Sequence, residues 1–532
     1  MNNHFRCMAL RGLSLFTAAA LLTACAASQA AAPAASESTA DEAVTFMAPY
    51  LNVEAFIDKV HSIYPEVNIE IVPYSGDNTT SCIQNMIEAH DLPDICTVTV
   101  YNPMTDDMSD QLIDLAGYDF TDNYIESRLQ EVTDNGAIYL LPSVYNCYGI
   151  TYNKTLLQQN GWTVPTSFAE LEQLAEKAEA AGVALCLPQS QYPGYGFQYM
   201  CNIADAGFLG TLDGKRWQKD YLSGKANVSG TPGMMQAMAY IQKWRDIGML
   251  NGDGDPTSDE VTRQRMINGD ALFLLGSTNG IVDADGTRDK FGLMPYLSED
   301  GSQNVFVLSV NRYFGLNKRL EQNPQKLEDA LKVMRVLSTV EGTTALYPET
   351  KVKSSLMPFK NAKTNDTYYT DIADALNFGS TAPFIYSGWE NTIVTTGNKM
   401  LDFMRGDATI DEGIAQLDAD QDKVVNNTPD LITTAAEDIP QEDCARLVER
   451  CFAEATGSDL ALVSLGTWIS GNPTEQNHYG VSGKLYAKGL TDYDLSVILP
   501  TGWNRTIQTV TLTGSQINDL LTEGYDAYGN GK

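Results

Sequence analysis

The sequence has few of the residues on which catalytic and metal chemistry most often depends. Only four histidines occur in 532 residues, and no nucleophile triad, phosphate-binding loop or dinucleotide fingerprint is present. Residues 251–255 begin like a calcium loop, but Pro256 and Thr262 stand where such a loop needs glycine and glutamate. We therefore expect a protein that is not an enzyme and that holds no metal and no cofactor.

Basic residues are also scarce. The chain has 35 Lys and Arg against 68 Asp and Glu, which gives a formal net charge of -33. Such a chain repels phosphate-rich partners at long range, so nucleic-acid binding is excluded as a main function. The charge by itself is that of an acidic exported protein.

Closely spaced cysteine pairs are missing. Of nine cysteines, Cys7 and Cys25 lie near the N-terminus, and seven remain, namely Cys82, Cys96, Cys147, Cys186, Cys201, Cys444 and Cys451. An odd number without pair motifs argues against a disulfide framework or a zinc ribbon. We expect most of them to be small buried apolar residues.

Near the N-terminus the apolar run at 13–22 is too short to span a bilayer comfortably. Arg6 and Arg11 precede this run, and Leu22-Thr23-Ala24-Cys25 lies at its end. This order resembles a lipoprotein signal, which implies cleavage before Cys25, lipidation of its sulfur and anchorage on the outer face of the membrane. Residues 26–43 are rich in Ala and Ser and predict a flexible tether. An ordinary export signal with an incidental cysteine is the alternative.

From residue 44 the chain alternates between strand and helix patterns. Apolar and β-branched runs at 44–49, 67–72 and 93–98 predict strands, and amphipathic helices lie between them. This order predicts a doubly wound α/β lobe with a mainly parallel sheet. Ligands of such sheets bind at the carboxyl ends of the strands.

Residues 137–182 contain the clearest local signals. Short runs at 139–142 and 149–152 predict strands, and a helix begins after Ser167, with Glu170 at capping-box spacing and Gly182 at the C-terminal cap. The order of these motifs, with Tyr152-Asn153-Lys154 and the Pro165-Thr166-Ser167 helix start, closely resembles the extracellular solute-binding proteins of bacterial importers, the family that includes the maltose-binding protein.

The resemblance covers about residues 44–427 and implies an α/β, two-lobed periplasmic-binding-protein-like fold of type II with a hinge. We expect lobe 1 at about 44–150 and 277–340 and lobe 2 at about 151–276 and 341–427. The strands at 291–295 and 305–310 are assigned to the first lobe, and 192–200 is expected to be a loop rich in glycine and aromatic residues.

A second resemblance begins after the composition break at 426–429. Residues 438–532 resemble part of the C-terminal domain of the 5'-nucleotidase family, so we expect a small, truncated α/β domain there. Its strands are expected at 461–465, 493–499 and 506–512, followed by a helix from Thr513.

The first resemblance implies that the protein is a monomer that captures a sugar between its lobes and delivers it to permease subunits. A sugar site needs aromatic faces and polar groups. The candidates at strand ends and crossings are Tyr50, Tyr101, Asn102, Tyr145, Tyr195, Ser277, Asn279, Tyr386 and Trp389. For each aromatic residue, a place in the core or at the rim remains the alternative. Ser277 and Asn279 lie where maltose-binding relatives have a tryptophan, so a malto-oligosaccharide is not implied.

Two hypotheses of other classes remain open. The nucleotidase-like segment would suit a nucleotide-processing surface enzyme, although the metal-ligand motifs of that family's catalytic domain are absent from this chain. It would also suit a nucleoside-binding module.

Overall fold

A computed structural model describes residues 42–48, 53–72, 79–99, 107–252, 254–276, 286–347, 356–363, 367–378, 381–384, 389–425, 431–463, 465, 481, 483–498 and 507–528. No helix in these ranges is long and apolar enough to cross a bilayer. All seven cysteines named above after Cys25 are described, and six of them are buried, as predicted.

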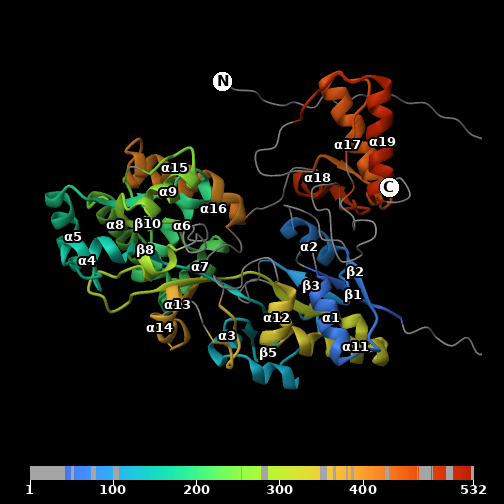
Figure 1. Ribbon diagram of the computed structural model, residues 1–532, viewed down its shortest axis with the longest axis horizontal. Helices are drawn as coiled ribbons and strands as arrows, with labels where there is room; N and C mark the ends of the chain where they lie inside the picture. Colours follow the sequence, from blue (N-terminus) through green and yellow to red (C-terminus); the bar gives the residue numbers. More distant parts are fainter. Residues whose placement is uncertain are drawn as a thin grey trace, which may run out of the picture. The chain divides into compact units, whose positions relative to one another are not determined.

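The first sheet has five strands in the order β2-β1-β3-β13-β6. Figure 1 labels β1, β2 and β3 of this sheet. Its strands are β1 (Val44–Met47), β2 (Ile69–Val72), β3 (Ile95–Val98), β6 (Leu141–Pro142) and β13 (Tyr313–Leu316). β1 is parallel to β2 and β3, whereas β13 runs antiparallel to β3 and β6. The predicted α/β lobe is confirmed, but the expectation of a mainly parallel sheet is wrong, because two of the four pairings among its described strands are antiparallel.

Helices α1 (Glu54–Ile63), α2 (Thr79–Glu88), α11 (Pro324–Leu337) and α12 (Val340–Leu346) belong to this lobe. α1 buries Phe56 and Val60, which are four residues apart and therefore on one face. The ring of Phe56 packs on that of Phe46 in β1, with centroids 5.7 Å apart. This contact joins helix and sheet in one apolar core.

The second sheet has four strands in the order β11-β8-β10-β9. They are β8 (Ile150–Asn153), β9 (Ala184–Pro188), β10 (Ala271–Leu275) and β11 (Phe291–Met294). β9 and β10 are parallel, and β8 runs antiparallel to both β10 and β11. Every residue of β10 is buried, as expected for a strand covered on both faces.

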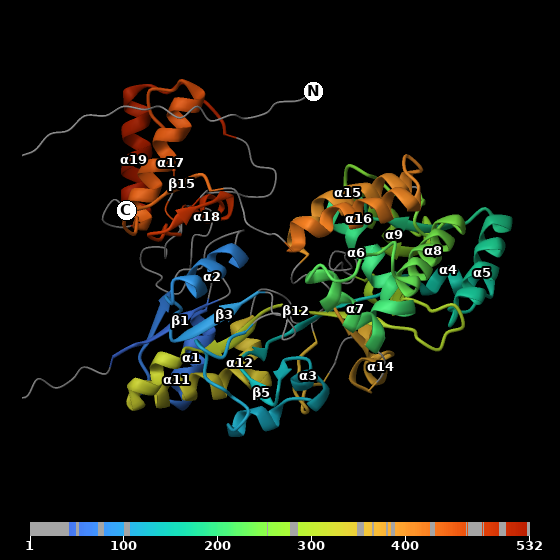
Figure 2. The ribbon, with the colours of Figure 1, turned by 180° about the vertical axis from the view of Figure 1, so that it is seen from behind.

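Helices of the second lobe pack on this sheet or on one another. They include α4 (Lys154–Asn160), α5 (Phe168–Ala181), α6 (Pro193–Ala204), α7 (Leu212–Leu222), α8 (Pro232–Asp246), α9 (Asp259–Asn268), α15 (Glu390–Arg405) and α16 (Ile410–Val425). Figure 2 shows α15 with α16 and α6, and these helices are in contact.

α6 corrects one expectation, because 192–200 is not a loop. Pro193 occupies the first turn, where a missing N–H costs nothing. A Cβ on Gly196 would lie 2.4 Å from the carbonyl oxygen of Gly397, and a Cβ on Gly397 would lie 2.1 Å from that of Pro193. The glycines therefore permit close packing of α6 against α15 rather than forming a loop.

α5 begins and ends where the sequence predicts. The Ser167 hydroxyl accepts the Glu170 backbone N–H at 3.3 Å, and Gly182 has the left-handed φ of 70° that ends the helix. The Glu170 carboxylate accepts the backbone N–H of Thr166 at 2.8 Å, one residue earlier than in a standard capping box. The cap thus fixes the turn that enters the helix.

A third sheet carries the chain between the lobes. It has the order β14-β12-β7 and consists of β7 (Tyr145–Tyr148), β12 (Phe306–Val310) and β14 (Thr381–Pro383). β7 connects β6 to β8, and β12 connects β11 to β13, so two of its strands join the first sheet to the second. Gly149 follows β7, and a Cβ there would lie 2.5 Å from the carbonyl oxygen of Met294. Only glycine fits this crossing without a backbone shift.

Three expected lobe assignments were wrong. Phe291–Met294 pairs with β8 in the second sheet, because its antiparallel register with 150–153 buries all four residues. Residues 306–310 form the crossing strand β12, so the chain re-enters the first lobe only at β13. α12 packs its Leu346 in the core of the first lobe, beyond the expected boundary at 340.

The C-terminal segment, residues 431–528, contains β15 (Thr433–Thr434), α17 (Gln441–Thr456), β16 (Gly489–Leu490), α18 (Asp492–Ile498) and α19 (Gly514–Tyr528). The helix expected from Thr513 is confirmed. The strand expected at 493–499 is wrong, since α18 occupies it. The Asp494 carboxylate accepts both the N–H and the hydroxyl of Thr491 at 2.8 Å, and this Thr-x-x-Asp cap starts a helix.

Two further strands expected in this segment are not formed by the described residues. Residues 461–463 and 507–512 have no regular structure, and Leu465 makes one isolated bridge with Val481. The resemblance to the 5'-nucleotidase C-terminal domain stays a prediction.

Candidate functional site

The carboxyl ends of the two parallel strands of the second sheet lie side by side. Leu275, the last residue of β10, is in register with Pro188, the last residue of β9. The Gln189 N–H donates to the carbonyl oxygen of Leu275 at 2.9 Å. Gly276 follows with a φ of 131°, and a Cβ there would lie 2.1 Å from the side-chain oxygen of Gln189. Open α/β sheets bind their ligands at such an edge.

A tyrosine and a carboxylate meet beside these strand ends. α6 carries Tyr195 in its first turn, and α9 begins with Asp259 after the cap residue Ser258. The Tyr195 hydroxyl donates to Oδ2 of Asp259 at 2.8 Å, and the Asp259 N–H donates to Oε1 of Gln191 at 3.1 Å. The two helix starts and the segment after β9 are therefore tied together.

One carboxylate oxygen of Asp259 has no hydrogen-bond donor. Asp259 is 7% exposed, and its Oδ1 has no hydrogen-bond partner among the residues described. Burial raises the pKa of the Asp259 carboxyl above its ordinary value, and the hydrogen bond from Tyr195 and the charge of Arg263 oppose that rise. A buried acceptor without a donor is costly unless a ligand supplies one.

Aromatic rings extend from this point along α6. The Tyr192 and Tyr195 centroids are 6.2 Å apart, and Tyr195 stacks on Tyr199 at 6.0 Å with an interplanar angle of 19°. Tyr199 is buried, and its hydroxyl lies 2.9 Å from the carbonyl oxygens of both Gln189 and Leu275. Tyr192 and Tyr195 are half-buried and can offer a ring face to a solute.

Of the three predicted site residues that the structure describes, Tyr145, Tyr195 and Trp389, only Tyr195 lies in this cluster. Tyr145 is 1% exposed in β7, where its hydroxyl donates to Oε2 of Glu131 at 3.1 Å and the Arg128 guanidinium lies 5.0 Å from its ring centroid. Burial raises the pKa of Glu131, which the charge of Arg128 opposes. Arg128 also donates to the carbonyl oxygen of Leu376 in α14 (Ala373–Phe378). Tyr145 thus belongs to the crossing between the lobes.

Trp389 lies in a separate aromatic cluster of the second lobe. Its ring stacks on Tyr221 with centroids 4.6 Å apart at 7°, and Phe197 and Trp217 also pack against it. The residue is 2% exposed, so contact with a solute would require this cluster to open. Its role in binding stays a prediction.

The other candidates, Tyr50, Tyr101, Asn102, Ser277, Asn279 and Tyr386, and the lipidation candidate Cys25, lie outside the described residues. Asp259 and Gln191 were missed by the sequence analysis. The available signal was the position of Asp259 at a helix start, in a segment that precedes a strand of the same sheet, but no local pattern pairs it with Tyr195, 64 residues earlier.

In the ranges that the structure covers, no group of three or more His, Cys, Asp or Glu side chains is placed to hold a metal ion. The site offers ring faces, amides and a carboxylate, which suit the recognition of a polar organic solute.

Comparison with known proteins identifies the family. Residues 53–347 match the family described as bacterial extracellular solute-binding protein. The maltodextrin-binding protein MdxE of Bacillus subtilis (strain 168) is 26% identical over 185 residues, which is 33% of this chain. The match spans only 40% of the length of MdxE.

Solved structures agree in fold. The bacterial solute receptor AcbH, reported with an exclusive preference for β-D-galactopyranose, superposes with a TM-score of 0.59 at 14% identity, covering 72% of this chain and 98% of that one. RafE in complex with raffinose superposes with a TM-score of 0.53 at 15% identity, covering 72% of this chain and 100% of RafE. The predicted two-lobed α/β fold of type II is confirmed, and the chain belongs to the bacterial extracellular solute-binding proteins.

Proposed function

We propose that the protein captures a carbohydrate between its two lobes and delivers it to the permease subunits of an ATP-driven importer. The observation that carries the proposal is the pairing of Tyr195 with Asp259 at the carboxyl ends of β9 and β10. A tyrosine face suits the C–H surface of a sugar ring, and the unpaired Asp259 oxygen suits a sugar hydroxyl. The substrates named for MdxE, AcbH and RafE, which are all carbohydrates, support this class of solute.

Closure would use the crossing sheet. β7 and β12 are paired antiparallel over four residue pairs, so they would turn together when the lobes approach. Hinges of this kind absorb the movement in a few backbone angles at element ends. Gly149, directly after β7, is well placed for that role.

A thermal-unfolding screen tests the class of solute. The panel contains maltotriose, raffinose and galactose, with dipeptides and nucleosides as comparison sets. A ligand present at about 100 times its Kd stabilises the folded state by about 2.7 kcal/mol, enough for a shift of several degrees. A shift with a carbohydrate alone supports the proposal. A shift with peptides or nucleosides and none with carbohydrates rejects it.

We propose further that lipidated Cys25 anchors the mature chain to the extracellular face of the cell membrane and that residues 26–43 form a flexible tether. The support is the sequence pattern around Cys25 together with membership of an extracellular family. Growth with labelled palmitate should label the wild-type protein, and Cys25→Ser should lose the label and appear in the medium. Equal labelling of both proteins would contradict the anchor.

A further inference from the structure

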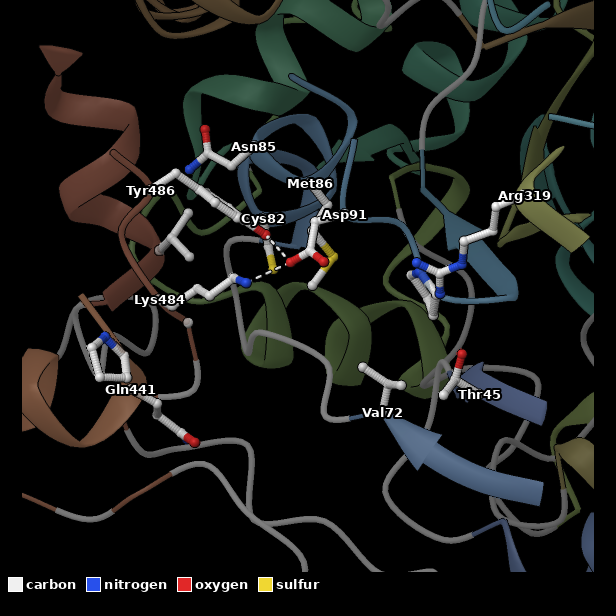
Figure 3. Close-up of a pocket in the computed structure, with 14 residues that line it drawn as sticks. Thr45, Val72, Cys82, Asn85, Met86, Asp91, Arg319, Gln441, Lys484 and Tyr486 are labelled. Carbon is white, nitrogen blue, oxygen red and sulfur yellow. Dashed lines mark hydrogen bonds and ion pairs between the residues drawn. The ribbon is translucent and has the colours of Figure 1, made fainter. Parts of the chain in front are cut away.

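A cavity of about 380 Å³ lies where the C-terminal segment meets the first lobe (Figure 3). Its walls come from both parts: Thr45, Val72, Cys82, Asn85, Met86, Asp91, Pro93 and Arg319 from the lobe, and Pro440, Gln441, Gly483, Lys484, Tyr486 and Val497 from the segment. The size is within the range of small-molecule sites. The cavity is separate from the Tyr195 site, because the lining residues include none from the second lobe.

Charged contacts hold the two walls together. Nζ of Lys484 lies 2.5 Å from Oδ2 of Asp91, and the Tyr486 hydroxyl donates to the same oxygen at 3.0 Å. Lys488 bonds to Glu88 at 2.6 Å and to Oδ1 of Asn85 at 3.0 Å. Because these contacts join α2 to the segment, the cavity has a defined shape rather than being a gap between independent parts.

Two cations on opposite walls keep hydrogen-bonding capacity. Two of the five N–H groups of the Arg319 guanidinium donate to Oδ1 of Asp94, each at 3.4 Å, whereas Lys326 holds Asp94 more closely at 2.8 Å. The Arg319 side chain is 47% exposed and that of Lys484 is 37% exposed. Of five guanidinium N–H groups and three ammonium N–H groups, several can turn to a ligand. Figure 3 shows both side chains at the cavity.

Two further features favour negative charge in the ligand. Pro440 and Gln441, at the N-terminus of α17, line the cavity, and Pro440 at the N-cap position makes no side-chain hydrogen bond to the helix. Helix N-termini attract anions, although the first-turn acids Glu442 and Asp443 of α17 oppose this. Independently, Nδ2 of the cavity-lining Asn85 has no acceptor among the residues described, and Asn85 is 5% exposed.

We propose that this cavity binds a small organic anion. Its carboxylate or phosphate group lies between Arg319, Lys484 and the start of α17, and its apolar body packs on Val72, Met86 and Val497. The ligand carries a single anionic group, because the net charge of -33 opposes a highly charged one. Binding bridges the first lobe and the C-terminal segment, so the segment completes a second site that the lobe alone does not have.

Ligand-observed NMR on the full chain at low salt tests the proposal with three probes of similar shape. Benzoate and phenyl phosphate carry the anion, and benzyl alcohol is the neutral control. Binding of at least one anion with at least tenfold weaker binding of the alcohol is expected. Comparing benzoate with phenyl phosphate tells a carboxylate site from a phosphate site. No binding of either anion up to about 10 mM, or equal binding of the alcohol, overturns the proposal.

Matched variants locate the binding. Arg319→Ala should weaken anion binding about tenfold, because it removes a charged donor while Lys326 still holds Asp94. Arg335→Ala is the control, since Arg335 pairs with Asp119 at a similar 3.3 Å but does not line the cavity. Val72→Phe should block the cavity without changing its charge. An equal loss of anion affinity in the Arg319 and Arg335 variants would contradict binding in this cavity. Unchanged anion affinity in the Val72 variant would contradict it as well.

Discussion

The Tyr195 hydroxyl donates a hydrogen bond of 2.8 Å to Oδ2 of Asp259, across 64 residues of chain. The bond joins the start of α6 to the start of α9 beside the ends of two parallel strands. It fixes the orientation of the Tyr195 ring and leaves Oδ1 of Asp259 without a donor in the described part of the chain. We therefore propose that the pair contacts a solute and does not serve only in packing.

Changing Tyr195 should lower affinity for the carbohydrate that the screen identifies. Tyr195→Ala removes the ring face and should weaken binding more than about tenfold, whereas Tyr195→Phe keeps the ring and should weaken it about threefold to tenfold. Isothermal titration calorimetry measures both. Tyr240→Phe is the control, because its hydroxyl bonds to the carbonyl oxygen of Leu297 away from the site. Unchanged affinity in Tyr195→Ala would remove this residue from the site.

The main effect of Trp389→Ala should be a loss of folding stability. The ring is 2% exposed and stacked on Tyr221, so its removal leaves a large cavity in the second lobe. The free energy of unfolding should fall by about 3–5 kcal/mol, measured by urea denaturation. A loss below about 1 kcal/mol together with weaker carbohydrate binding would instead place Trp389 at the solute.

Arg128→Ala should destabilise the crossing between the lobes. Arg128 bonds to Glu131 at 2.7 Å and lies over Tyr145, and its side chain is 4% exposed. The Glu131 side chain is 25% exposed, so the pair is not fully buried. The free energy of unfolding at pH 7 should therefore fall by about 2–3 kcal/mol, less than for a fully buried pair. Chemical denaturation at pH 7 and pH 5 checks this, and the loss should shrink at pH 5 as Glu131 takes up a proton. A loss that grows on acidification would refute the charge argument.

Asp205 should make stability fall as pH rises. It is 5% exposed in the short π-helical turn 205–209, and its Oδ2 has no partner in the ranges described. Burial raises the pKa of Asp205 well above its ordinary value. The folded protein therefore holds this proton more tightly than the unfolded chain, and the cost of Asp205 is absent below the unfolded pKa and grows as pH rises toward the folded pKa.

Asp205→Asn should accordingly raise the free energy of unfolding at pH 7 by about 1 kcal/mol or more. The gain over wild type should disappear near pH 4, close to the ordinary pKa of an aspartate. Urea denaturation across this pH range measures the difference. A gain that is equal at all pH values would show that the proton of Asp205 is not involved.

Local signals account for what the sequence predicted well. The Ser167 and Gly182 caps of α5 depend only on neighbouring residues, so this helix begins and ends where expected. The alternation of β1, α1 and β2 likewise needs no distant information. The prediction of two lobes came from the family resemblance.

The features that the sequence analysis assigned wrongly or missed depend mainly on contacts between residues far apart in the chain. The run at 291–294 fits either sheet by composition, and only its register with β8 decides that it belongs to the second. Residues 493–498 are apolar enough for a strand, but the Thr491–Asp494 cap makes them helical. Asp259 becomes a candidate site residue only because folding brings it to Tyr195.

Small-angle X-ray scattering tests the central claim most directly, since closure of two lobes over a carbohydrate makes the molecule smaller. Profiles are recorded for the wild type and for Tyr195→Ala, each alone and with maltotriose, raffinose or galactose. The account predicts that at least one sugar lowers the radius of gyration of the wild type and that the variant needs much more of it. A radius that none of the sugars changes, while a peptide or nucleoside does lower it, would contradict the account.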